Sequence, residues 1–146
     1  MRFQVYSRLL AELYSSKNHN EKSIIISIKT PSDKSNPTII KNEQNNIIDI
    51  LSLEFDDVED YYQGLSPINN EQAKQIVDFV ELYKDTVDLI IVHCDAGVSR
   101  SAGICAALAK WLTNNDKHYF DGISYVPNMC CYKKVLNEVM LRSDVK

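Results

Sequence analysis

The chain has 146 residues, of which 45% are hydrophobic and 25% charged, and its formal net charge is −4. This length and this balance fit one globular domain over residues 1–146 with a single core. A chain of net negative charge has no overall attraction for nucleic acid or for an anionic membrane, so we expect neither as a partner.

The spacing of apolar residues predicts three strands and one helix in the first half of the chain. These elements are a strand over 2–6, a helix over 7–15 with Leu9, Leu10 and Leu13 on one side, and strands over 23–28 and 47–55. The strand over 23–28 contains three consecutive isoleucines, a pattern typical of a strand buried on both faces. Residues 29–46 are polar and contain two prolines, so we expect mainly an exposed loop there.

The second half of the chain predicts one strand and four helices. The expected elements are an acidic, aromatic loop over 56–67, a helix over about 70–84, a strand over 88–92, a helix over 101–112, a short helix within 114–124, and a last helix from 128. Asn69 and Gln72 have the spacing of a capping box at the start of the first of these helices. Strands that alternate with helices indicate an α/β domain with a central, mostly parallel sheet flanked by helices.

The N-terminal residues, the lengths of the apolar runs and the cysteines favour a reducing compartment. Residues 1–10 lack the unbroken apolar core of a signal peptide, and no apolar run approaches the length that spans a bilayer. We therefore expect a cytoplasmic protein with four thiols, Cys94, Cys105, Cys130 and Cys131. These cysteines form no Cys-x-x-Cys pair and the three histidines are scattered, so we expect no metal site.

The most informative stretch runs from His93 to Ser101, with the letters HCDAGVSRS. It lies between a predicted strand and a predicted helix, the architecture in which backbone N–H groups and a helix N-terminus bind an anion. Its cysteine, Cys94, and its arginine, Arg100, suit phosphoryl transfer to sulfur. A thiolate nucleophile needs an electropositive pocket, and a guanidinium matches two phosphate oxygens at once.

This stretch resembles the signature of the cysteine-dependent protein tyrosine phosphatases, dual-specificity members included. The pattern His-Cys-x-x-Gly-x-x-Arg-Ser/Thr is matched from His93 to Ser101 without departure. The resemblance implies a dual-specificity-phosphatase-like fold and hydrolysis of phosphate monoesters through a phosphocysteine, with no metal or organic cofactor. It also implies a phosphate-binding loop formed by Asp95, Ala96, Gly97, Val98, Ser99 and Arg100.

Three further residues receive roles from this resemblance. Ser101 is expected to donate a hydrogen bond to Cys94 and make sulfur a better leaving group. His93 is expected to orient the loop and help the thiolate to form, although a structural role alone is also open. The family uses an Asp after an upstream strand as general acid, and Asp57 fits, 37 residues before Cys94 (94 − 57).

The general acid has two alternatives in the same loop, Asp56 and then Asp60. Asp57 is favoured because the sequence around it resembles a group of small bacterial phosphatases. That group has a Leu-x-Leu-x-Phe-x-Asp-Ile segment, then a Gly and a Pro, and Pro-Asn before a final helix. The matching residues here are Phe55, Asp57, Val58, Gly64, Pro67, Pro127 and Asn128.

The expected substrate is a phosphotyrosine protein or a small aryl phosphate, with phosphoserine and phosphothreonine left open. The loop holds an acid and no lysine, which disfavours inositol phosphates and other polyanions. Tyr61 and Tyr62 are candidates for the rim of the pocket. We expect a monomer.

Three alternatives remain beside this prediction. The first is a pseudophosphatase that reads phosphate with negligible turnover. The second, an arsenate reductase, is disfavoured because those relatives place the loop near the N-terminus and the acid downstream. The third is a narrower hypothesis, in which Cys130 or Cys131 traps oxidised Cys94 as a disulfide.

Overall fold

A four-stranded sheet with the order β1-β4-β2-β3 organises the computed structural model, which describes residues 1–144. The strands are β1 (Arg2–Tyr6), β2 (Ser23–Lys29), β3 (Ile47–Glu54) and β4 (Leu89–His93). All three neighbouring pairs run parallel. The expected α/β class with a parallel sheet is therefore confirmed.

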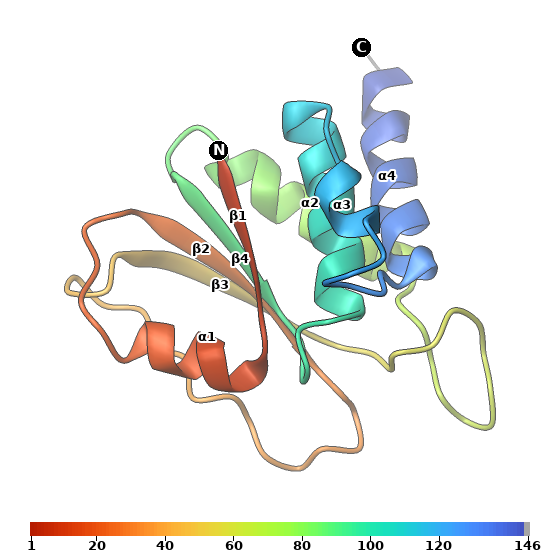
Figure 1. The fold of residues 1–146 in the computed structure, drawn as a ribbon, viewed down its shortest axis with the longest axis horizontal. Helices are drawn as coiled ribbons and strands as arrows, with labels where there is room; N and C mark the ends of the chain where they lie inside the picture. The colour runs from red at the N-terminus through yellow and green to blue at the C-terminus, as the bar shows by residue number, and fades with distance from the viewer. Residues whose placement is uncertain (145–146) are drawn as a thin grey trace.

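The helices cover the two faces of the sheet unequally (Figure 1). They are α1 (Arg8–Ser15), α2 (Asn70–Tyr83), α3 (Arg100–Thr113), the 3-10 helix η1 (Lys117–Phe120) and α4 (Met129–Asp144). Helices α2, α3 and α4 lie together on one face, whereas α1 lies on the other. The expected elements are all present, the short helix within 114–124 as η1, and the other predicted bounds differ from the observed ones by at most one residue. Among residues 1–144, no helix is long and apolar enough to cross a lipid bilayer.

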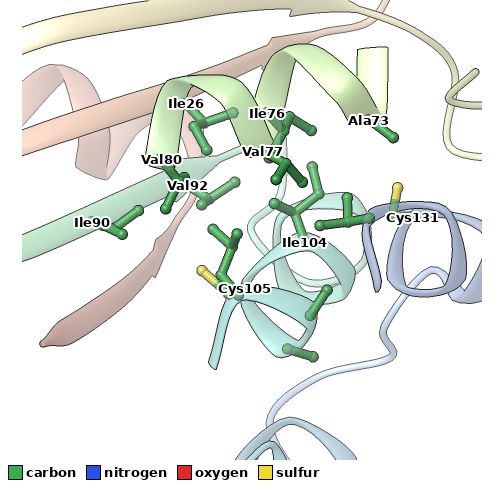
Figure 2. Close-up of a cluster of buried hydrophobic side chains, with 14 of the residues drawn as sticks. Ile26, Ala73, Ile76, Val77, Val80, Ile90, Val92, Ile104, Cys105 and Cys131 are labelled. Carbon is green, nitrogen blue, oxygen red and sulfur yellow. The ribbon is translucent and has the colours of Figure 1, made fainter. Parts of the chain in front are cut away.

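The main core lies between the sheet and α2, α3 and α4. Figure 2 shows Ile26 and Val92 of the sheet beside Val77 of α2 and Ile104 of α3. All five residues of β4 are buried, as is nearly every residue of β2, which agrees with the unbroken apolar runs in the sequence. Because β4 is central and fully buried, the loop that follows it has a rigid base.

The start of α2 is fixed to the end of β3, next to the acidic loop. Asn69 and Gln72 form the predicted capping box, with the Gln72 amide N–H donating to Asn69 Oδ1 over 2.8 Å. Gln72 Nε2 also donates to the backbone carbonyl of Glu54 over 2.8 Å. The two ends of the acidic loop are therefore held together.

Helix α1 packs through its small residues. Ala11 and Ser15 are its buried residues, and the Ser15 hydroxyl bonds to the backbone of Ile40. The three leucines that share one side are exposed by 65%, 49% and 46% for Leu9, Leu10 and Leu13. The predicted apolar side exists, but it faces away from the sheet.

Candidate active site

The predicted phosphate loop, residues 94–100, connects the end of β4 to the start of α3. Its backbone is bonded to the end of β1 and the start of α1: the Cys94 amide donates to Tyr6 O (3.4 Å) and the Arg8 amide to Asp95 O (3.2 Å). Gly97 lies at the closest approach, with φ +72°. A Cβ there would stand 2.6 Å from Ser7 N, so both the backbone angle and the contact require glycine.

The candidate nucleophile, Cys94, is buried at the end of β4. Its sulfur lies 3.0 Å from the hydroxyl oxygen of Ser101, which is buried in the first turn of α3. A hydroxyl at this distance can donate to a thiolate and stabilise it. The contact expected between these two residues is present.

His93 anchors the phosphate loop to the sheet through both ring nitrogens. Nδ1 lies 3.3 Å from the Cys94 carbonyl and Nε2 lies 2.6 Å from the Ser27 hydroxyl. The carbonyl can only accept, so Nδ1 carries the proton. Burial lowers the pKa of His93, which makes the ring neutral near pH 7, and Nε2 then accepts from Ser27. His93 therefore orients the loop through hydrogen bonds and brings no full positive charge to Cys94.

Arg100 is only 4% exposed, and both terminal nitrogens of its guanidinium have a protein partner. Nη1 donates to the Phe55 carbonyl over 2.7 Å and Nη2 to Asp95 Oδ2 over 3.2 Å. Among residues 1–144, its buried Nε has no hydrogen-bond partner. A buried donor without an acceptor costs about 1–3 kcal/mol, so the Nε–H of Arg100 is suited to an incoming anion.

The backbone of the loop adds further donors for an anion. The amide N–H groups of residues 95–99 make no hydrogen bond to any residue within 1–144. Ser99, the N-cap of α3, does not cap the helix with its side chain, which leaves the first amides of the helix free as well. Loop, helix start and Arg100 together form a cradle of N–H donors.

The acidic loop brings Asp57 to the phosphate loop. Asp57 Oδ1 accepts from the Ser99 hydroxyl (2.8 Å) and from Asn128 Nδ2 (3.0 Å). Asp56 is buried and serves its own loop instead, because its carboxylate and its amide both bond to the backbone of Ser66. The Asp60 carboxylate accepts from the amide of Tyr61. Of the three candidate acids, Asp57 is the one that contacts the phosphate loop.

Asn128 is a site residue whose role was not predicted. It is buried just before α4, where its side chain donates to Asp57 and to the Val58 carbonyl (3.1 Å) and accepts from the Cys131 amide. Its own backbone N–H donates to the Ser99 carbonyl. The sequence signal was the Pro127-Asn128 pair, which the resemblance singled out without a function.

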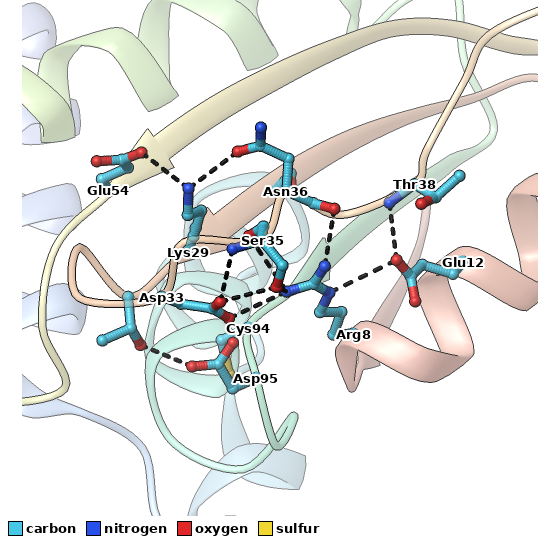
Figure 3. Close-up of polar contacts among 12 residues, drawn as sticks. Arg8, Glu12, Lys29, Asp33, Ser35, Asn36, Thr38, Glu54, Cys94 and Asp95 are labelled. Atoms are coloured by element: carbon cyan, nitrogen blue, oxygen red, sulfur yellow. Dashed lines mark hydrogen bonds and ion pairs between the residues drawn. The ribbon is translucent and has the colours of Figure 1, made fainter.

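The loop over residues 30–46, predicted to be exposed, also reaches the site. The Thr30 hydroxyl donates to Asp95 Oδ2 over 2.6 Å. Asp33 and Asn36 lie further along this loop and accept from the Arg8 guanidinium of α1, Asp33 through Oδ2 (3.0 Å) and Asn36 through its carbonyl (2.7 Å). Figure 3 shows these contacts together with Cys94 and Asp95. None of these three contacts was predicted, since each joins residues more than twenty positions apart.

A groove of about 620 Å³ opens beside Asp57. Its lining includes Asp57 and Ser99 from the site, and also the acidic and aromatic loop residues Glu59, Asp60, Tyr61 and Tyr62. Tyr61 and Tyr62 are mostly exposed on its rim. The groove reaches the phosphate loop at Ser99, and a role for the two tyrosines at the substrate pocket stays a prediction.

The remaining cysteines are packing residues with weakly acidic thiols. All four cysteines are free in the described part of the chain. Burial raises the pKa of the Cys131 thiol well above its usual value, and it raises that of Cys130 as well. Thiols of this kind are slow to react as thiolates. The predicted disulfide trap of Cys94 stays a hypothesis.

The fold matches solved structures of phosphatases, although the sequence matches no protein-family model and no curated protein. Human DUSP28 aligns with a TM-score of 0.60 at 12% identity, over 99% of this chain and 95% of that one. PTPMT1 aligns with a TM-score of 0.57 at 17% identity, over 99% and 96%. A human tyrosine phosphatase-like serine/threonine/tyrosine-interacting protein aligns with a TM-score of 0.57 at 18% identity, over 84% and 80%.

These likenesses identify the fold of the chain. The chain has the fold seen in these dual-specificity and tyrosine phosphatase-like structures, which share 12–18% of its residues. Proteins with this fold differ in their ligands and described roles. One PTPMT1 structure is a complex with PI(5)P, and another protein is described as a tyrosine phosphatase-like interacting protein. The fold therefore leaves activity and substrate to be argued from the site. Placement in a bacterial subgroup stays a prediction from the sequence.

Proposed function

We propose that this chain is a cysteine-dependent phosphatase that hydrolyses phosphotyrosine monoesters through a phosphocysteine, with phosphoserine and phosphothreonine monoesters as a second substrate class to be tested. One observation carries the proposal: the buried Nε edge of Arg100 has no acceptor within residues 1–144, at the end of the loop that begins with Cys94. A phosphate supplies the acceptor that this edge lacks. The free amides of the same loop support the same ligand.

In the first step, Cys94 Sγ attacks phosphorus in line with the ester oxygen. The P–S bond forms as the P–O bond breaks, and the departing oxygen takes a proton from Asp57. The loop amides and the Arg100 guanidinium bind the three other oxygens of the phosphoryl group. The Ser99 and Asn128 hydrogen bonds to Asp57 support this role, because they fix the carboxyl group beside the loop.

In the second step, water attacks the phosphorus of phosphocysteine. The P–S bond breaks, its electron pair returns to sulfur, and Asp57 accepts the proton of the water. Ser101, 3.0 Å from the sulfur, stabilises the departing thiolate by donating a hydrogen bond. Inorganic phosphate leaves and the Cys94 thiolate is restored, so the cycle requires no metal or organic cofactor.

The substrate class follows from charge and shape around the loop. The phosphate loop has an acid, Asp95, and no lysine, and the chain carries a net charge of −4, which favours a single phosphate over a polyanion. The exposed Tyr61 and Tyr62 offer flat apolar surface to an aromatic ring.

We further propose a cytoplasmic monomer that acts on phosphorylated proteins or small aryl phosphates and binds neither nucleic acid nor membranes.

The direct test is hydrolysis of an aryl phosphate under reducing conditions across pH. We expect wild-type turnover, no turnover for Cys94→Ser, and a loss of about 100-fold or more for Asp57→Ala with a flattened basic limb. Asp56→Asn is the matched control, because an amide oxygen can still accept from Ser66. A flattened limb in Asp56→Asn with a normal limb in Asp57→Ala would move the general acid to Asp56.

The same assay decides between the enzyme and a binding module. A wild-type protein that binds inorganic phosphate or a phosphopeptide but releases no product would be a phosphate-reading pseudophosphatase. The human tyrosine phosphatase-like interacting protein shares this fold, which makes that outcome worth a direct binding measurement.

A further inference from the structure

Asp95 occupies an unusual position for an acid, directly after the candidate nucleophile. Its side chain is 44% exposed, yet one oxygen is bonded on two sides. Oδ2 accepts from the Thr30 hydroxyl over 2.6 Å and from Arg100 Nη2 over 3.2 Å. Figure 3 shows the Asp95 carboxylate beside Cys94.

The two protein contacts of Arg100 are made by its terminal nitrogens, whereas Nε makes none within residues 1–144. Nη1 bonds to the Phe55 carbonyl and Nη2 bonds to Asp95. In a guanidinium, Nε–H and the N–H of Nη2 on the same side form a parallel pair of the kind that matches two oxygens of a phosphate. Asp95 and Phe55 therefore hold the two terminal nitrogens of Arg100 and leave its Nε–H free for a phosphate oxygen.

Thr30 stands at a place that the sheet fixes. It follows Lys29, the last residue of β2, and β2 pairs with β4 up to Ser27 and His93. The backbone of Thr30 also accepts from the Asp33 amide in a tight turn. A hydroxyl fixed in this way can hold the Asp95 carboxylate in one orientation, at little cost in side-chain entropy.

We propose that Thr30 and Asp95 are positioning residues for phosphate binding. Thr30 orients the carboxylate of Asp95, and Asp95 orients the guanidinium of Arg100 so that its Nε edge receives the phosphate. This inference deepens the proposed function and rests on it. It assigns Asp95 a role for its side chain, beyond the backbone amide that the loop motif alone implies.

The arrangement has a consequence for charge. The carboxylate of Asp95 offsets part of the positive charge of Arg100, so it weakens the general attraction of the cradle for anions. Asp95 thus orients the guanidinium but lowers the electrostatic attraction of the site for anions. A variant that disturbs the orientation without changing the charge therefore isolates the proposed role, and Thr30→Val is such a variant.

The test compares Thr30→Val, which loses the hydroxyl, with Thr30→Ser, which keeps it. The readouts are the Kd for inorganic phosphate by calorimetry and kcat/KM for an aryl phosphate. We expect Thr30→Val to weaken phosphate binding and lower kcat/KM by about three- to tenfold, and Thr30→Ser to restore most of both. Thr86→Val is the matched control, because Thr86 lies in the turn before β4, at the opposite end of that strand from the phosphate loop.

A double-mutant cycle separates positioning from a general effect on the fold. In an Asp95→Ala background, Thr30→Val should have no further effect on either readout, because Thr30 acts through Asp95. Equal effects of Thr30→Val in the two backgrounds would overturn the proposal, as would equal values for Thr30→Val and Thr30→Ser. Thermal unfolding of each variant checks that the fold is retained.

The phosphate Kd also keeps this inference distinct from the proposed function. If wild type binds phosphate without turnover, the phosphatase proposal fails, while the ratio of Kd values for Thr30→Val and Thr30→Ser still decides the positioning role. If wild type binds no phosphate, both proposals fail together.

Discussion

At the scale of single residues, the hydroxyl of Ser99 links the phosphate loop to the candidate general acid. Ser99→Ala removes one of the two donors to Asp57 and leaves the backbone of the loop unchanged. We expect a rate loss that grows with the pKa of the leaving group, from little effect on an activated nitrophenyl phosphate to about tenfold on phenyl phosphate. The measurement is a series of aryl phosphates. Equal losses across the series would mean that Ser99 serves phosphate binding and not the acid.

His93 predicts a specific dependence of stability on pH. Burial lowers its pKa in the folded state below the usual value of 6.5. As the pH falls below about 6.5, the unfolded chain takes up a proton that the folded chain does not, so stability falls, by at most about 1.4 kcal/mol per pH unit. Above that pH, both states are neutral at this residue and the effect disappears.

His93→Asn provides the comparison, because asparagine does not titrate. Its free energy of unfolding, measured with denaturant between pH 5 and 8, should fall less steeply below about pH 6.5 than that of wild type. The variant will be less stable at every pH, since it loses the bonds to Ser27 and Cys94, so the slopes are the quantity to compare. Parallel curves would mean that His93 has the same proton affinity in both states.

The motif residues could be named from a local pattern, and Asp57 from its resemblance to a family segment, whereas the site contacts of Asn128 and Thr30 could not be predicted. Cys94, Arg100 and Ser101 lie within eight positions, so a local pattern suffices to name them. Asn128 and Thr30 reach the site from 71 and 65 positions away from their partners Asp57 and Asp95. Such contacts depend on strand order and helix packing, which no local pattern encodes.

At the scale of elements, Gly103 lets the start of α4 approach α3. A Cβ at this position would collide with the backbone carbonyl of Asn128 and stand 3.0 Å from Cys131 Cβ. Alanine raises helix propensity by about 1 kcal/mol over glycine, but a collision with backbone in a packed interface costs about 1–3 kcal/mol. We expect Gly103→Ala to be destabilising overall and to lower activity through displaced Asn128, as denaturant unfolding and the phosphatase assay would show.

The sign of the change in stability on Gly103→Ala tests this interpretation. A more stable and fully active Gly103→Ala protein would mean that α4 can move away from α3 without cost, and that Asn128 does not depend on this contact.

The exposed leucines of α1 show a limit of sequence patterns. Periodicity indicates which residues share a side of a helix, whereas the packed side of α1 is formed by the small residues Ala11 and Ser15.

At the scale of the whole molecule, the class of fold was predictable and the order of its strands was not. Apolar runs followed by helices indicate a parallel sheet, and the sheet has that form. The order β1-β4-β2-β3 places β4 between β1 and β2, which brings Ser7 against Gly97 and Ser27 against His93. The phosphate loop therefore owes its shape to segments that are distant in sequence.

The overall charge predicts a preference among substrates. The net charge of −4 and the acid within the phosphate loop disfavour ligands with several phosphates. We expect kcat/KM for a singly phosphorylated tyrosine peptide to exceed that for an inositol polyphosphate by about tenfold or more, with a gap that narrows at high salt as the repulsion is screened. A preference for the polyphosphate, with or without salt, would contradict the assigned substrate class.

The central claim is that phosphate passes through Cys94, and trapping that intermediate tests it most directly. Wild type and Asp57→Ala are quenched in acid during turnover of an aryl phosphate, and the phosphorylated peptide is mapped by mass spectrometry. The account predicts phosphate on Cys94, absent in Cys94→Ser and with altered occupancy in Asp57→Ala, because Asp57 serves both steps. Phosphate on another residue, or an active Cys94→Ser protein, would contradict it.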